Sequence, residues 1–190
     1  VVSESTEDVL RFGGVADDGM DQPYFTVSIP RVVRKRIVWL LLLFLAGTLT
    51  GSVLSFFENE LERMVLLSVF IPLLIGTGGN TGAQTVSTVI RGLALGEIRS
   101  RDAGRVIVRE LLSGLLLGAL LGCVAFAWAL AWGHPLNLAI VVALTITAIC
   151  VWANMIGALV PLVARRFGID PATVSAPLIT TLVDATGLAI

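Results

Sequence analysis

Long uncharged apolar stretches alternate with short polar connections along most of this chain. Five such runs follow one another after residue 30, and a helix needs roughly 20 apolar residues to cross the hydrocarbon of a bilayer. The predicted spans cover residues 37–57, 64–95, 106–132 and 136–163, with a fifth that begins near Pro171. The pattern therefore predicts an all-α membrane protein with five transmembrane helices per chain. The second run is overlong, which leaves room for a tilt or a break within it.

Composition agrees with a membrane protein, because 56% of the residues are hydrophobic and only 14% are charged. Residues 1–29 differ, since they are acidic and rich in turn-forming residues. We interpret them as a linker or docking segment, and residues 30–190 as the five-helix membrane domain. We expect the natural protein to be longer at both ends. The net charge of −1 gives no reason to expect a nucleic-acid partner.

Basic residues are distributed asymmetrically around the predicted spans. In the connections that follow the first and third spans, Arg63 is the only basic residue. The remaining arginines and the lysine lie in the N-terminal segment, before the first span, or near the connections that follow the second and fourth spans. Because basic connections stay on the cytoplasmic side, we predict a cytoplasmic N-terminus and a C-terminus on the outside.

Asp184 is the acidic residue that the sequence places deepest in a predicted span. Counted from Pro171, it lies about 20 Å along the fifth helix, near the bilayer midplane. Thr180, Thr181 and Gly187 share its helical face. No lysine or arginine lies at a matching depth, so an intramembrane ion pair is excluded. Asp184 is predicted to face a cation path; a protonated carboxyl group hydrogen-bonded to another helix is the alternative.

The second span contains the segment IGTGGNTGAQ, with four glycines, an asparagine and a glutamine. Glycine weakens a regular helix, and irregular backbone at membrane depth is tolerated where it is buried or lines a wet cavity. We therefore predict a loosened helix that lines a hydrated path. Its predicted lining residues are Gly76, Gly79, Asn80 and Gln84. The alternative is close helix packing through pairs of small residues.

Two further features are expected to serve helix packing. Asn154 in the fourth span is predicted to hydrogen-bond to a neighbouring helix, with pore lining as the alternative. Glycines 114, 118 and 122 recur every four residues along the third span and predict a packing ridge. The sequence contains no Ser/His/Asp arrangement, Walker loop or paired intramembrane acids, so nothing in it indicates an enzyme.

The segments PLLIGTGGNTGAQTVSTVIRGLALGEI and DPATVSAPLITTLVDATGL resemble the transmembrane domain of the MgtE magnesium channels, and the resemblance covers residues 30–190. TEDVLRFGGV is similar to the end of the CBS-domain region that precedes the channel in that family. The resemblance implies a homodimer in the plasma (inner) membrane of a prokaryote, with one pore on the two-fold axis lined by the second and fifth spans. It also implies cytosolic regulatory domains that this sequence lacks.

The resemblance also implies roles for individual residues. The pore aspartate of the family corresponds to Asp184, and the turn that precedes it corresponds to Ala176, Pro177 and Thr180. The GGNxGxQ segment of the family corresponds to Gly79, Asn80, Gly82 and Gln84. Ala176 departs from family members that carry an asparagine there, so that any ligand from this position would be its backbone carbonyl.

We therefore expect a channel domain that conducts Mg²⁺ into the cytoplasm. Mg²⁺ prefers carboxylate oxygens and retained waters, and a two-fold axis would supply two Asp184 carboxylates for one ion. Mn²⁺, Co²⁺ or Ni²⁺ could also pass, although the absence of His and Cys along the path favours hard ions. Two alternatives stay open: a proton-coupled secondary transporter for divalent cations, in which Asp184 cycles a proton, and a membrane scaffold without transport.

Overall fold

The computed structural model describes residues 13, 24–63, 65–171 and 174–190. All regular secondary structure in these residues is helical. The helices are α2 (Ile29–Phe56), α3 (Glu58–Arg63), α4 (Val65–Ser68), α5 (Ile71–Ala94), α6 (Ala103–Ala131), α7 (Leu136–Arg166) and α8 (Ala176–Gly187), with short 3-10 turns η1 (Tyr24–Thr26) and η2 (Ser100–Asp102). The linker predicted for residues 1–29 lies almost entirely outside the described residues.

Four helical segments of the described chain are long and apolar enough to cross a membrane: Ile29–Phe56, Val65–Ala94, Ala103–Ala131 and Leu136–Arg166. They coincide with the first four predicted spans, because a run of about 20 apolar residues is a local property of the sequence. The fifth crossing stays a prediction, since α8 has 12 residues and is about 18 Å long.

The fifth helix begins later than the sequence predicts. We expected it to start near Pro171, but α8 starts at Ala176. Ser175 precedes it with extended backbone, and its hydroxyl oxygen accepts a hydrogen bond from a backbone N–H of the first turn at 3.3 Å. Such a cap starts a helix, and Pro177 is tolerated in the first turn because its missing N–H has no intrahelical partner there. Asp184 consequently lies about 12 Å from the start of its helix.

The overlong second span breaks near its first residues, not at its glycines. Between α4 and α5 the chain turns at Val69 and Phe70, and Pro72 lies in the first turn of α5. From Ile71 the helix then continues without interruption through all four glycines to Ala94. The prediction that the glycines loosen this helix is wrong. Their backbone keeps its helical bonds, and the missing side chains instead allow neighbouring helices to approach.

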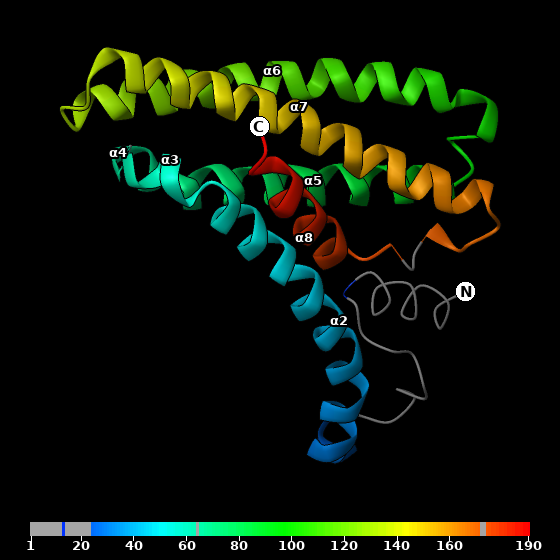
Figure 1. Ribbon diagram of the computed structural model, residues 1–190. Coiled ribbons are helices and arrows are strands. Elements are labelled where there is room, and N and C mark those ends of the chain that lie inside the picture. Colours follow the sequence, from blue (N-terminus) through cyan, green and yellow to red (C-terminus); the bar gives the residue numbers. More distant parts are fainter. Residues whose placement is uncertain (1–12, 14–23, 64, 172–173) are drawn as a thin grey trace.

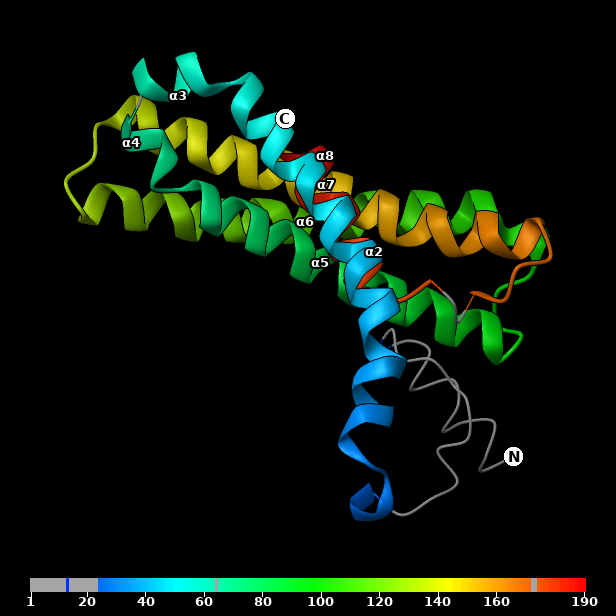
Figure 2. The ribbon, with the colours of Figure 1, turned by 60° about the horizontal axis from the view of Figure 1, so that its bottom comes forward.

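Helix α7 is the centre of the bundle. It packs against α6 on one side and α5 on the other, while α8 packs against α5, α2 and α7. Figures 1 and 2 show α2 leaving the bundle along its N-terminal half, whereas α5, α6 and α7 run side by side. No residue of α2 is buried within this chain. Helix α7 therefore contacts both α5 and α8.

The predicted glycine ridge on α6 is confirmed. A Cβ atom placed on Gly118 would lie 2.8 Å from Cα of Thr147 in α7, and one on Gly122 would lie 2.7 Å from the backbone oxygen of Ala143. Gly114 is similarly close to the backbone of α7 at Cys150. Helices approach this closely in membranes where small residues line the contact.

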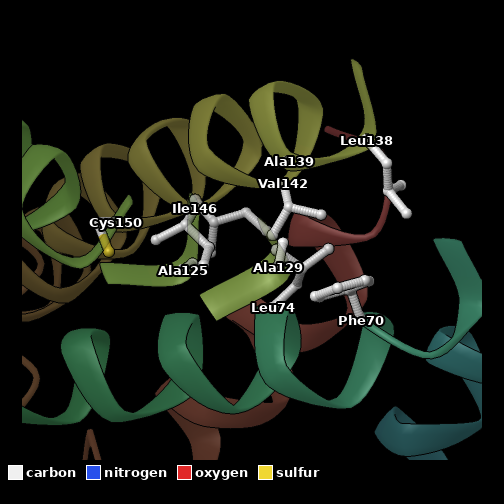
Figure 3. Packing of buried hydrophobic residues seen from close by; sticks show 10 residues of the cluster. Phe70, Leu74, Ala125, Ala129, Leu138, Ala139, Val142, Ile146 and Cys150 are labelled. Atoms are coloured by element: carbon white, nitrogen blue, oxygen red, sulfur yellow. The ribbon is translucent and has the colours of Figure 1, made fainter. Parts of the chain in front are cut away.

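A buried apolar cluster joins α5, α6 and α7 near the α6–α7 turn (Figure 3). Its members are Phe70, Leu74, Ala125, Ala129, Leu138, Ala139, Val142, Ile146, Ile149 and Cys150. Because small and large side chains alternate across the contact, the cluster fills the space between the three helices. It fixes that end of α5 by apolar packing.

Candidate functional site

The carboxyl group of Asp184 lies in the contact between α8 and α5. Its Oδ1 atom is buried and accepts no hydrogen bond from the described part of the chain. A Cβ atom placed on Gly79 of α5 would lie 3.0 Å from this oxygen and 3.5 Å from Cβ of Thr180. Gly79 therefore makes room for the carboxyl group. A carboxylate at membrane depth is stable only with a proton, water, a cation or a protein donor as its partner.

Two threonines extend the polar surface of α8 beside Asp184. The hydroxyl groups of Thr180 and Thr181 both donate to the backbone oxygen of Pro177, at 2.8 and 2.9 Å. Their hydrogens are therefore used within the helix, while their oxygen lone pairs can still accept bonds from water or coordinate a cation. Both side chains are half-buried. Their part in an oxygen-lined path stays a prediction.

The remaining candidate residues of α8, Ala176 and Gly187, do not lie beside the Asp184 carboxyl group as the threonines do. Ala176 is the first residue of the helix and is half-buried. Gly187 is buried, and a Cβ atom there would meet Ile149 of α7 at 4.0 Å. Gly187 therefore faces α7, whereas Asp184 faces Gly79 of α5.

Helix α5 carries an exposed polar stripe next to this site. We define the polar stripe as the exposed residues Gly76, Asn80, Gln84, Thr88 and Arg91. They follow one another at spacings of three or four residues, which places them on one helical face. Asn80 follows Gly79 directly, so this face lies about 100° around the helix from the residue that touches Asp184. The polar stripe and the Asp184 surface are adjacent.

The other glycines of the segment pack against neighbouring helices. A Cβ atom on Gly78 would lie 2.6 Å from Cγ2 of Ile149, and one on Gly82 would lie 3.1 Å from Cγ2 of Ile179. Gly76 differs, because nothing lies within 4 Å of its Cβ position. The alternative of close packing is thus confirmed for Gly78 and Gly82. This packing brings the predicted residues of α5 and α8 together.

Asn154 of α7 forms a buried bridge between three helices and is only 1% exposed. Its Oδ1 accepts a hydrogen bond from the hydroxyl group of Thr85 in α5 at 3.0 Å. Its Nδ2 donates to the backbone oxygen and to Oε2 of Glu110 in α6, at 3.0 and 3.2 Å. The predicted interhelical hydrogen bonding is confirmed. Its partner Thr85 is buried, whereas Gln84 of the polar stripe is exposed.

Glu110 is the residue that sequence reasoning missed. It lies close to the basic connection before α6, so its position suggests a solvated surface residue. Yet it is four residues before Gly114 and so lies on the helical face that packs against α7. Counting back from Gly114 by the same spacing of four residues would have identified Glu110 as part of this face.

A second hydrogen bond connects α7 to α8. The indole Nε1 of Trp152 donates to the hydroxyl oxygen of Thr186 at 2.7 Å, and Thr186 in turn donates to the backbone oxygen of Leu182 at 2.7 Å. Trp152 precedes Asn154 by two residues, and Thr186 follows Asp184 by two. Polar bonds from one short segment of α7 therefore reach both α5 and α8.

A single chain offers few ligands for a metal ion. Within the described residues, no group of three or more His, Cys, Asp or Glu side chains is close enough to hold one. A cation beside Asp184 would therefore depend on hydroxyl, amide or backbone oxygens, on water, or on a second chain.

Comparison with known proteins identifies the family of this chain. Residues 71–190 match the sequence profile of MgtE, described as a divalent cation transporter. The chain is 42% identical over 188 residues to "Magnesium transporter MgtE" of Thermus thermophilus, covering 99% of this chain and 41% of that protein. It is 34% identical to proteins of the same name from Bacillus subtilis and Enterococcus faecalis, covering 100% and 94% of this chain and 41% and 39% of those proteins. The chain thus spans less than half the length of these relatives.

Proposed function

Because this chain belongs to the MgtE family of divalent cation transporters, we propose that it is the membrane domain of a magnesium channel, in which Asp184 binds the passing ion. Relatives along nearly its whole length carry the name magnesium transporter. Several bacterial species supply these relatives, and the proposed location is the plasma (inner) membrane of a prokaryote. Mg²⁺ is the proposed cargo, and Mn²⁺, Co²⁺ and Ni²⁺ are the ions proposed to compete with it.

The observation that carries this proposal is the buried Oδ1 of Asp184, which lacks a hydrogen-bond donor in the described chain and lies over Gly79. A buried carboxylate needs a compensating positive charge or a proton. Mg²⁺ with part of its water shell meets this need, because carboxylate oxygens are its usual protein ligands. Asn80 and Gln84, on the adjacent polar stripe, offer amide oxygens that can hold the waters of the ion.

The polar stripe also supports a homodimer. Amide side chains on a membrane-spanning helix are unfavourable toward lipid and favourable toward a wet pore. A second copy related by a two-fold axis in front of α5 and α8 would cover the stripe and bring two Asp184 carboxylates to one axis. Two carboxylates then balance one divalent ion. The proposed pore is lined by α5 and by α8, whose continuation would complete the fifth crossing.

The proposed orientation follows from the basic residues at one end of the bundle. The guanidinium Nη1 of Arg165 donates to the backbone oxygen of Ile98 at 2.8 Å, so the arginines after α5 and those at the end of α7 lie together. This end is the proposed cytoplasmic side. The electrochemical gradient would then drive Mg²⁺ inward past Asp184, toward the cytosolic regulatory domains that precede such a channel.

The proposal is tested by Mg²⁺ uptake into proteoliposomes that contain this chain and a Mg²⁺-sensitive dye. We expect Asp184→Ala to abolish uptake and Asp184→Asn to reduce it strongly. Asp102→Asn is the matched control, because the Asp102 carboxylate accepts a hydrogen bond from the backbone N–H of Arg99 in the connection before α6, outside the proposed path. Uptake by Asp184→Ala equal to that of the control would refute the role of Asp184. Uptake accompanied by stoichiometric proton movement would favour the proton-coupled transporter instead.

A further inference from the structure

The two proposed pore walls, α5 and α8, pack against each other mainly through apolar surfaces. Val86 and Ile90 of α5 pack in one apolar cluster with Ile179 and Val183 of α8. Beside this cluster, α8 lies close over Gly78, Gly79 and Gly82. Among the described residues, no side-chain hydrogen bond joins these two helices. Apolar packing is not directional. The directional bonds that set the register between Asp184 and the polar stripe therefore come from another helix.

Helix α7 supplies directional bonds to both walls. Asn154 holds α5 through Thr85, at 3.0 Å, and Trp152 holds α8 through Thr186, at 2.7 Å. Thr85 directly follows Gln84 of the polar stripe, and Thr186 lies half a turn beyond Asp184. Each bond thus fixes the height and rotation of a helix next to the residues that would contact the ion.

Glu110 fixes the orientation of the Asn154 side-chain amide. The backbone oxygen and the carboxylate of Glu110 both accept from Nδ2, which turns Oδ1 toward α5. Oδ1 then faces the hydroxyl group of Thr85, which donates to it. Because an unsatisfied buried polar group is costly, the fully bonded arrangement is favoured over other rotations of α5.

We propose that Glu110, Asn154 and Trp152 are positioning residues that hold α5 and α8 in the register required for Mg²⁺ binding at Asp184. This inference rests on the proposed channel function. None of the three contacts the proposed ion path, and each acts through Thr85 or Thr186. The bonds keep the ligand oxygens of α5 and α8 at a fixed separation before the ion arrives.

The experiment measures the half-saturating Mg²⁺ concentration and the maximal rate of uptake separately. Thr85→Val and Trp152→Phe each remove one hydrogen bond. The first replaces a hydroxyl group by a methyl group of similar size, and the second also removes part of an aromatic side chain that is 37% exposed. We expect each to raise the half-saturating concentration about threefold, the typical effect of one interhelical hydrogen bond in a membrane protein. Thr147→Val is the matched control, because the Thr147 hydroxyl donates to Gly118 of α6 at 3.1 Å and reaches neither α5 nor α8.

Glu110 variants separate hydrogen bonding from charge. Glu110→Gln keeps an oxygen that can accept from Asn154, so we expect a half-saturating concentration close to that of the unmodified chain. Glu110→Ala removes the acceptor and should behave like Thr85→Val. If Glu110→Gln instead lost affinity as strongly as Glu110→Ala, the carboxylate charge would be needed and the positioning role would be refuted.

Asp184→Ala distinguishes this inference from the channel proposal. If Asp184→Ala abolishes uptake while Thr85→Val and Trp152→Phe match Thr147→Val in half-saturating concentration, the positioning role is refuted and the channel assignment stands. If Asp184→Ala retains full uptake, both proposals are refuted. Thr85→Ser keeps a hydroxyl donor at this position, and an affinity close to that of the unmodified chain in this variant supports the hydrogen bond as the cause.

Discussion

Gly79 and Asp184 face each other across the contact between α5 and α8, so that a Cβ atom on the glycine would lie 3.0 Å from the buried carboxylate oxygen. Position 79 requires a residue without a side chain, because a Cβ atom would crowd the carboxyl group. The glycine-rich segment therefore has a steric role at the site as well as in packing. Its backbone remains an ordinary α-helix throughout.

Gly79→Ala tests this relationship. The added methyl group forces the Asp184 carboxyl group to shift, while the helix itself tolerates alanine well. We expect about tenfold weaker Mg²⁺ affinity, the order of effect seen when the support of a metal ligand is disturbed. The measurement is Mg²⁺ uptake against concentration. Gly104→Ala on α6 is the control, because nothing lies within 4 Å of its Cβ position; equal affinity in the two variants would contradict the prediction.

Gly118→Ala is expected to lower the stability of the fold. Its Cβ atom would meet Cα and the backbone oxygen of Thr147 at 2.8 and 2.9 Å, and backbone atoms cannot move aside as a side chain can. Overpacking of this kind costs about 1 to 3 kcal/mol. Thermal unfolding in detergent should show a lower midpoint than for the unmodified chain. Gly104→Ala should leave the midpoint unchanged or raise it, and a similar loss in both variants would argue against the α6–α7 contact.

Arg165→Ala is expected to expose the connection between α5 and α6 to proteases. The guanidinium group of Arg165 donates to the backbone oxygen of Ile98, and its removal leaves the connection held by fewer bonds. Trypsin should then cleave after Arg99 or Arg101 several times faster, as followed by mass spectrometry of the fragments. Arg166→Ala removes the same charge from an exposed neighbour. Identical cleavage rates in both variants would mean that the Ile98 bond does not order the connection.

The proposed dimer predicts which positions of two chains lie close together. In a chain with Cys123→Ser and Cys150→Ala, a cysteine introduced by Gln84→Cys on the polar stripe should form a disulfide between copies after mild oxidation. Leu116→Cys, on the exposed face of α6 away from α5, should not. Gel electrophoresis without reducing agent measures both. Efficient cross-linking through position 116 and none through position 84 would place the two-fold axis elsewhere.

Much of the architecture follows from local features of the sequence. The first four spans are visible because each is a run of apolar residues long enough for the bilayer, and such a run folds as a helix wherever backbone polar groups find no water. The glycine ridge on α6 and the bonding of Asn154 also follow from spacing and residue type. These predictions needed no knowledge of which helices are neighbours.

Other predictions failed where the outcome depended on neighbouring helices. The glycines of α5 were expected to loosen the helix, because their propensity in isolation is low; contact with Ile149, Ile179 and Asp184 instead makes them the residues that fit. The fifth helix was expected from Pro171, but the cap at Ser175 delays it.

The sequence by itself determined that this chain is a helical membrane protein of the MgtE family with an acidic residue in its last apolar segment, because hydropathy, composition and motif spacing are properties of the chain alone. Only the tertiary structure decided that Gly79 lies against Asp184, that Glu110 is part of the buried network, and that α7 connects both proposed pore walls. These relationships join residues far apart in sequence, and they exist only once close packing has selected which helix faces meet.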